Sequence, residues 1–217
     1  MTAETVNSVP DRDAAAGGAV LTRERCVHAL NRFQVVAADT GGRRAAVALA
    51  VVERPDGPVL LLTLRPSRMR AHPGQFALPG GGIDAGETPE QAAVRELEEE
   101  LGVAADSNAV LGRLDDFVTR SGYMITPVVV WVGALEDPIR PNPDEVAMVF
   151  EVTEAELDAE PALGSLPGHI GNLFQWPFRG EHLYAPTGAI IHQFREVVLH
   201  DRSTRVTAFV QPDFASR

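Results

Sequence analysis

The chain has 217 residues, a formal net charge of −11 and 45% hydrophobic residues, which fits one domain with a sizeable core. Such an acidic chain lacks the broad basic face that nucleic acids and anionic membranes require, so neither is expected as a partner. Its single cysteine excludes an internal disulfide. It has no apolar run of about 18 residues and no signal-peptide pattern, so a soluble cytoplasmic protein is expected.

The first segments in chain order are a predicted tail and a predicted helix. Residues 1–20 show no periodicity and are expected to form a mobile N-terminal tail. Residues 21–217 are expected to form a single domain with an N-terminal helix and a C-terminal extension. Thr22 can cap that first helix, which is predicted to run to about Phe33. Strand-like runs follow at Ala45–Val52, Val59–Leu64, Ala109–Val118, Met124–Val132 and Val146–Val152.

The middle of the chain predicts a loop followed by a helix. Ala71–Gly86 contains seven proline and glycine residues and is therefore predicted to be a loop. The next segment, Pro89–Leu101, is predicted to be a helix because Thr88 and Gln91 can form a capping box before it. Gly102 is typical of the residue that ends such a helix.

The last third of the chain predicts two more helices. A short one is expected to begin at Thr153, where Glu156 completes a second capping box. The final helix is predicted over Gly188–Leu199 from its helical spacing of apolar residues. Since helices and strands are mixed without strict alternation, we expect an α/β fold with a mixed sheet flanked by helices.

Three glutamates gather on one face of the predicted helix Pro89–Leu101. At about 100° per residue, Glu96, Glu99 and Glu100 share an arc of about 100°. Because clustered carboxylates repel each other, a hard divalent cation such as magnesium or manganese would stabilise them. The alternative is a solvated acidic face without a ligand. An apolar stripe on the same helix consists of Val94, Leu97 and Leu101. This stripe would anchor the helix to the sheet and leave the glutamates on its rim.

Residues 81–103 resemble the Nudix box at every defined position. Those positions are Gly81, Glu87, Arg95, Glu96, Leu97, Glu99, Glu100, Gly102 and Val103. The resemblance implies a Nudix-type α/β/α sandwich with a loop–helix–loop metal site, which hydrolyses a diphosphate linkage with Mg²⁺ or Mn²⁺.

The same resemblance implies a role for individual residues. Glu99 and Glu100 would be metal ligands, with Glu96 as a ligand or as the general base. The carbonyl of Gly80 matches a backbone ligand found in some members. A pair that braces the loop against the helix would be formed by Glu87 and Arg95.

The chemistry itself also favours these residue types. A diphosphate repels an attacking water, and a divalent cation offsets that charge while a carboxylate takes the proton. Gly81 and its neighbours allow the backbone to approach the phosphates closely.

The segment before the box resembles the coenzyme A pyrophosphatase branch of that family. Positions in register are Leu61, Leu62, Thr63, Arg65, Arg70, Gly74, Pro79, Gly80 and Gly81, whereas Pro66 and Leu78 depart from the signature. The branch implies hydrolysis of coenzyme A or its derivatives to 4′-phosphopantetheine and adenosine 3′,5′-bisphosphate. Arg65 and Arg70 are expected to bind substrate phosphate, because guanidinium groups suit phosphate oxygens. One segment, Tyr184–Phe194, departs from the sequence expected of the branch.

Several alternatives stay open at this stage. The substrate could instead be ADP-ribose, a dinucleotide or a nucleoside triphosphate, or the fold could serve as a non-catalytic sensor. Glu145 is either a distal carboxylate of the site, and then a second candidate for the general base, or a solvated turn residue. Trp131 and Trp176 are expected to be packing residues. The sequence does not decide whether the chain forms a homodimer.

Overall fold

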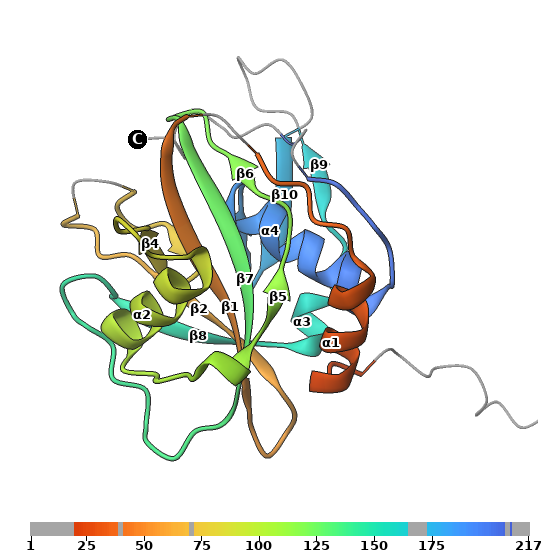
Figure 1. The fold of residues 1–217 in the computed structure, drawn as a ribbon, viewed down its shortest axis with the longest axis horizontal. Helices are drawn as coiled ribbons and strands as arrows, with labels where there is room; N and C mark the ends of the chain where they lie inside the picture. The colour runs from red at the N-terminus through yellow and green to blue at the C-terminus, as the bar shows by residue number, and fades with distance from the viewer. Residues whose placement is uncertain (1–19, 39–40, 70–71, 165–172, 207–208, 210–217) are drawn as a thin grey trace, which may run out of the picture.

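The structure is a computed structural model (Figure 1). It describes residues 20–38, 41–69, 72–164, 173–206 and 209. Almost all of the predicted tail, residues 1–19, and the predicted substrate-binding residue Arg70 lie outside these ranges. Within the ranges, no helix is long and apolar enough to cross a membrane.

The described chain forms helices and two sheets. Its helical segments are α1 (Arg23–Arg32), α2 (Pro89–Leu101), α3 (Glu154–Leu157), α4 (Thr187–Phe194), the 3₁₀ turn η1 (Ser107–Ala109) and the π-helical turn η2 (Arg195–Leu199). The strands of the large sheet are β1 (Arg43–Glu53), β2 (Val59–Leu64), β3 (Phe76–Ala77), β4 (Gly80–Gly82), β5 (Val110–Arg113), β6 (Phe117–Val118), β7 (Tyr123–Ala134) and β8 (Met148–Thr153). A three-stranded sheet contains β9 (Ala162–Gly164), β10 (Leu173–Phe178) and β11 (Glu181–Leu183).

The helices with local capping signals form where they were predicted. The bounds of α2 match the prediction, and the Thr88 hydroxyl accepts a hydrogen bond from the Gln91 N–H at 3.2 Å. Gly102 ends the helix in the left-handed region with φ of 66°, which glycine adopts without steric cost. Thr22 and Thr153 cap α1 and α3 in the same way.

Three predictions of secondary structure were wrong in part, and three strands were missed. The predicted loop Ala71–Gly86 contains two short strands, β3 and β4. The predicted strand Ala109–Val118 is divided into β5 and β6, and its first residue belongs to η1. The predicted final helix begins one residue earlier and changes to π-helical geometry after Phe194. The strands β9, β10 and β11 were not predicted at all.

The large sheet is mixed, as expected. β1 pairs with β7 in parallel, and its other edge pairs antiparallel with β2 and with β4. β8 extends the sheet beyond β2, while β5 and β6 pair with β7. The long parallel pair β1–β7 therefore lies at the centre, with shorter antiparallel strands around it (Figure 1).

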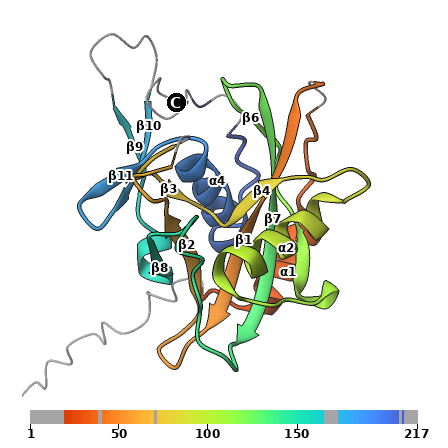
Figure 2. The same cartoon turned by 90° about the vertical axis from the view of Figure 1, so that its left-hand side faces the viewer.

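Alternate residues of β1 face two separate hydrophobic cores, as the period of two in a strand requires. Ala46, Ala48 and Ala50 pack with residues of α2. Leu49 and Val51 pack in the other core with α1 and α4. Figure 2 shows α2 and α4 on opposite sides of the sheet. This α/β/α layering is the architecture that the sequence predicted.

The small sheet packs against the core through aromatic side chains. Phe178 of β10 contacts Phe76 and Phe150, with ring centroids 5.6 Å apart in both pairs. Trp176 is fully buried and Trp131 nearly so, which confirms the prediction that both are packing residues. Through Phe76, the C-terminal region thus reaches the strand β3 beside the glycine strand.

Candidate active site

The helix α2 lies directly behind the glycine strand β4. A Cβ atom added to Gly81 would lie 2.2 Å from Oε1 of Glu96, and one added to Gly80 would lie 2.3 Å from the carbonyl oxygen of Ala46. Neither glycine has a positive φ. Both positions therefore require glycine because of close packing, and Gly81 brings the backbone against Glu96.

Arg95 links the helix to the loop that precedes it. Its guanidinium donates to both carboxylate oxygens of Glu87 at 2.9 and 3.1 Å and to the carbonyl of Gly82 at 2.9 Å. It also donates to Glu96 at 2.8 Å and to Glu99 at 3.0 Å. Arg95 thus holds the loop, the glycine strand and two of the glutamates in one arrangement.

Glu96, Glu100 and Glu145 form a cluster of three carboxylates. One oxygen of each lies within 4.8 Å of the others. Glu99 is not part of this cluster, since its side chain is 56% exposed and bonds to Arg95. The structure thus brings together two of the three predicted glutamates, Glu96 and Glu100, and adds Glu145. The sequence had left two roles possible for Glu145, a carboxylate of the site or a solvated turn residue.

The sequence prediction placed the glutamates on the rim of the helix, and for Glu100 this was wrong. Glu100 is only 2% exposed. The small side chains of Ala92 and Ala93 are fully buried and let the sheet approach that side of the helix closely. Val94, by contrast, is only half-buried, so the buried face is rotated from the predicted stripe toward the glutamates.

Burial changes the protonation of the cluster. It raises the pKa of Glu100 to about 8, although the positive charge of Arg65 acts in the opposite direction. Burial also raises the pKa of Glu96, against the effect of Arg95. The negative charges of Glu96 and Glu145 raise the pKa of Glu100 further. The cluster thus groups three carboxylates in a partly buried site, where a bound cation would favour their ionised form.

Glu145 reaches the cluster because its turn docks on the end of α2. The N–H of Asn142 donates to the carbonyl of Glu100, and the N–H of Arg140 donates to the carbonyl of Leu101, both at 2.8 Å. These carbonyls are the ones that a helix end leaves without partners. The Asn142 side chain then donates to Glu145 at 3.3 Å, which orients that carboxylate.

A cavity of about 330 Å³ lies beside the glycine strand, on the α4 side of the sheet. Gly80, Gly81 and Gly82 line it with their backbone. Arg65 also lines it, and its buried Nε has no hydrogen-bond partner within the part of the chain that the structure describes. Since Arg65 also acts on the charge of Glu100, it is close to both the cavity and the carboxylate cluster.

The other basic residues before the glycine strand have different surroundings. Arg68 is exposed and bonds to the carbonyl of Pro143 and, at 3.1 Å, to Asp144. It therefore contacts the turn that carries Glu145. His72 lines the cavity and its Nδ1 lies 3.2 Å from Oε1 of Gln75.

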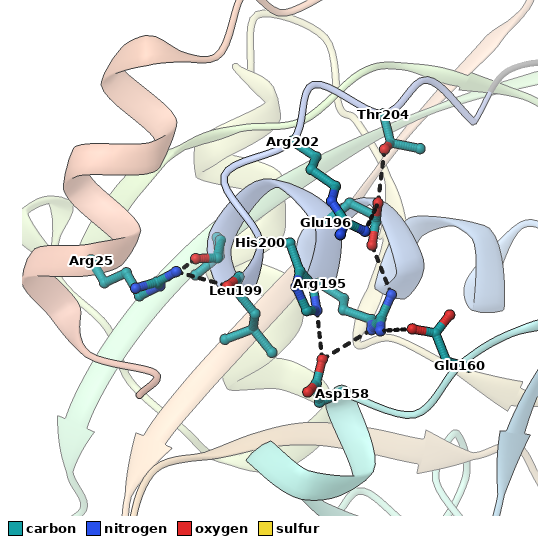
Figure 3. Close-up of polar contacts among 10 residues, drawn as sticks. Arg25, Asp158, Glu160, Arg195, Glu196, Leu199, His200, Arg202 and Thr204 are labelled. Carbon is teal, nitrogen blue, oxygen red and sulfur yellow. Dashed lines mark hydrogen bonds and ion pairs between the residues drawn. The ribbon is translucent and has the colours of Figure 1, made fainter. Parts of the chain in front are cut away.

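A second cluster of charges lies at the end of α4 (Figure 3). Arg195 is only 3% exposed and donates to Asp158 at 3.2 Å, to Glu160 at 2.5 Å and to Glu196 at 2.7 Å. Although burial opposes it, the Thr204 hydroxyl and the Arg202 guanidinium hold the pKa of Glu196 below its ordinary value.

The carboxylate cluster on α2 fits a hard divalent cation. Its donors are carboxylate oxygens, close enough to share one ion, and magnesium and manganese prefer such ligands. Histidine and cysteine, which zinc prefers, are not part of the cluster.

Comparison with known proteins gives a family match. The model of the NUDIX domain matches residues 42–169, which is more than half of the chain. A protein named "Uncharacterized Nudix hydrolase NudL" from Escherichia coli O6:H1 is 39% identical over 133 residues, 58% of this chain and 68% of the relative. A protein of the same name from Yersinia pestis (strain Pestoides F) is 43% identical over 111 residues, 51% of this chain. That match spans 55%, about half, of the Yersinia relative.

Solved structures of similar fold carry related names. The Nudix hydrolase RenU from M. Smegmatis has a TM-score of 0.48 at 25% identity, covering 71% of this chain and 84% of that chain. The MutT protein from Methanosarcina mazei Go1 has a TM-score of 0.44 at 20% identity, covering 59% of this chain and 86% of that chain.

Proposed function

The chain belongs to the Nudix family of hydrolases, and from that membership we propose that it hydrolyses coenzyme A or its derivatives. The products would be 4′-phosphopantetheine and adenosine 3′,5′-bisphosphate. The observation that carries the proposal is the position of Arg65, a residue of the coenzyme A signature. It lines the cavity, keeps a buried Nε without a protein partner among the described residues, and acts on the charge of Glu100.

The carboxylate cluster would hold the metal in this proposal. Glu96, Glu99 and Glu100 are the proposed ligands, together with the carbonyl of Gly80, and Glu145 is close enough to Glu96 and Glu100 to join them. A bound Mg²⁺ or Mn²⁺ would offset the charge of the diphosphate oxygens and make water more acidic.

Other residues of the chain position the substrate and move the proton. Arg65 would donate hydrogen bonds to a diphosphate oxygen, because it lies near both the cluster and the cavity. Glu96 or Glu145 would accept the proton of the attacking water. Arg95 and Glu87 would keep the loop and the glutamates in place through their two hydrogen bonds. Arg70 remains a proposed phosphate-binding residue from the signature alone.

One observation favours a different diphosphate as a second candidate. The segment Tyr184–Phe194 departs from the coenzyme A branch in sequence, and it contributes Pro186, Thr187 and Ile190 to the cavity wall. Because these residues border the space beside Gly80–Gly82, a substitution here changes what the cavity accepts. ADP-ribose, a dinucleotide or a nucleoside triphosphate would be cleaved by the same carboxylates. The complete set of three glutamates argues against a sensor that only binds its ligand.

A turnover screen tests the proposal. The purified chain is incubated with Mg²⁺ and, separately, with coenzyme A, ADP-ribose and NADH, and the products are separated by chromatography. We expect coenzyme A to yield 4′-phosphopantetheine and adenosine 3′,5′-bisphosphate. Cleavage of ADP-ribose with intact coenzyme A would instead assign the second candidate. Glu100→Gln, purified in parallel, shows whether any activity comes from a contaminant.

A further inference from the structure

The first turn of α4 forms one wall of the cavity beside the glycine strand. Thr187 and Ile190 line the cavity, although Ile190 is only 1% exposed. The hydroxyl of Thr187 donates to the carbonyl of Phe76 at 3.3 Å, which joins α4 to β3. Figure 2 shows α4 on one side of the sheet and α2 on the other.

The charges around this cavity are distributed unevenly. The residues that α4 contributes are uncharged, and so are Val47 and Ile125 on the sheet beneath. The basic groups, Arg65 and His72, come from the end of β2 and the segment before β3. A phosphate buried against the uncharged walls would lose its hydration without gaining an ionic partner, which is costly. These walls therefore suit an uncharged group.

The two halves of coenzyme A differ in that property. The adenosine half carries a 3′-phosphate, whereas the pantetheine arm carries no charge beyond the diphosphate. A cavity of about 330 Å³ is at the small end of ligand pockets, which span roughly 300–1,000 Å³, so it fits one half of the molecule. Its apolar walls with a few hydroxyl groups match an arm that contains amides and methyl groups.

On the basis of the proposed function, we infer that this cavity binds the pantetheine arm and that Ile190 of α4 determines which arm is accepted. Arg65 then lies where the arm joins the diphosphate, and the adenosine with its 3′-phosphate lies outside the cavity. Ile190 is a specificity-determining residue, and Thr187 is a positioning residue that holds the α4 wall to β3.

Binding of the two products to the full-length chain tests the inference, because each product carries one half of the substrate. Isothermal titration calorimetry with 4′-phosphopantetheine and with adenosine 3′,5′-bisphosphate is performed on the wild type and on Ile190→Phe, which narrows the cavity. Ile190→Ala, which widens it, is a second variant in case the larger side chain disturbs folding. Ile191→Ala is the matched control, since Ile191 is equally buried on the same helix but does not line the cavity.

We expect Ile190→Phe to weaken 4′-phosphopantetheine at least ~10-fold while adenosine 3′,5′-bisphosphate changes less than ~2-fold. Ile190→Ala should act in the same direction, and Ile191→Ala should bind both products as the wild type does. A selective loss of adenosine 3′,5′-bisphosphate, or equal loss of both products, overturns the inference but leaves the coenzyme A reaction intact. A wild type that binds neither product and does not cleave coenzyme A overturns the inference and the proposed function together.

Discussion

Two buried glutamates of this protein have pKa values that are shifted in opposite directions. Glu100 on α2 is 2% exposed and Glu196 at the end of α4 is 6% exposed, yet the pKa of Glu100 is raised to about 8 and that of Glu196 is lowered. Glu196 accepts hydrogen bonds from Arg195, Arg202 and Thr204. Glu100 instead faces two further carboxylates.

The difference separates a structural cluster of charges from a functional one. Where arginines meet the carboxylates, the chain itself supplies the positive charge and the cluster links elements of the fold. Where the carboxylates meet each other, the fold holds a site that a cation would complete. Both glutamates are buried, so the identity of the neighbours decides the role.

Metal removal should have the largest effect on activity. It should act through the cluster of Glu96, Glu100 and Glu145 and not through the charges around Arg195. Excess chelator is expected to abolish hydrolysis, and added Mg²⁺ or Mn²⁺ should restore it, because carboxylate oxygens are the ligands available there. Activity is measured by product chromatography. Melting curves with and without metal sharpen the comparison, since a cation that binds the folded state raises Tm. Full activity in excess chelator would refute the metal mechanism.

Replacement of Arg195 should have the next largest effect, on stability. Arg195→Met removes the nearest of the three hydrogen-bond partners of the buried Glu196, which should lower the free energy of unfolding by about 3 kcal/mol. Urea denaturation measures this loss. The KM of protein that remains folded should stay close to that of the wild type. Unchanged stability would mean that the cluster at the end of α4 does not hold the fold together.

In contrast to Arg195→Met, Glu100→Gln should lower activity and leave stability almost unchanged. We expect turnover to fall ~100- to 1,000-fold, about the effect of losing one major electrostatic group in an active site. The metal-free variant should melt at the same temperature as the wild type near pH 7 and slightly higher than the wild type above pH 8, where Glu100 would carry a repulsive charge. Glu98→Gln, an exposed glutamate on the same helix, is the control. A large loss of stability in Glu100→Gln would assign Glu100 to the structural class.

Arg65→Ala should have a smaller effect, on substrate binding. A charge-assisted hydrogen bond to phosphate contributes roughly 1.5–3 kcal/mol, or a 10- to 150-fold change in KM. Since Arg65 acts on Glu100, we expect equal losses for coenzyme A and for dephospho-coenzyme A, which retains the diphosphate. If binding were weakened for coenzyme A alone, Arg65 would instead contact the 3′-phosphate.

Local signals allowed α2 and its bounds to be predicted from the sequence. A capping box, a proline at the first helical position and a glycine at the end all depend on residues within a few positions of each other. The strand β4 carried no such signal, because three glycines have no preference for a strand. Its pairing with β1 depends on the space between β1 and α2, which no local pattern reports.

Long-range contacts explain what the sequence did not reveal about the site. The helical projection placed Glu96, Glu99 and Glu100 within one arc, but it did not show that Glu99 is exposed and outside the cluster. Nor could it show that Ala92 and Ala93 bring the sheet close enough to bury Glu100. Glu145 joins the cluster only because its turn bonds to the last carbonyls of α2. Its acidic, proline-rich sequence is equally typical of an exposed turn, so the sequence alone left both interpretations open.

The π-helical turn η2 follows α4 directly and continues it with a different helical geometry. A π-turn contains an extra residue, so it shifts the angular position of every later residue relative to a regular helix. In η2, the carbonyls of Val198 and Leu199 both accept from the Arg25 guanidinium, at 2.6 and 2.7 Å. Deleting one residue of η2 before Val198 would rotate Val198 and Leu199 by about 100° around the helix axis. Both hydrogen bonds to Arg25 of α1 would then be lost. The first turn of α4, which contains Ile190, would keep its orientation. Insertions and deletions in η2 can therefore change the contact with Arg25 while the cavity wall stays unchanged.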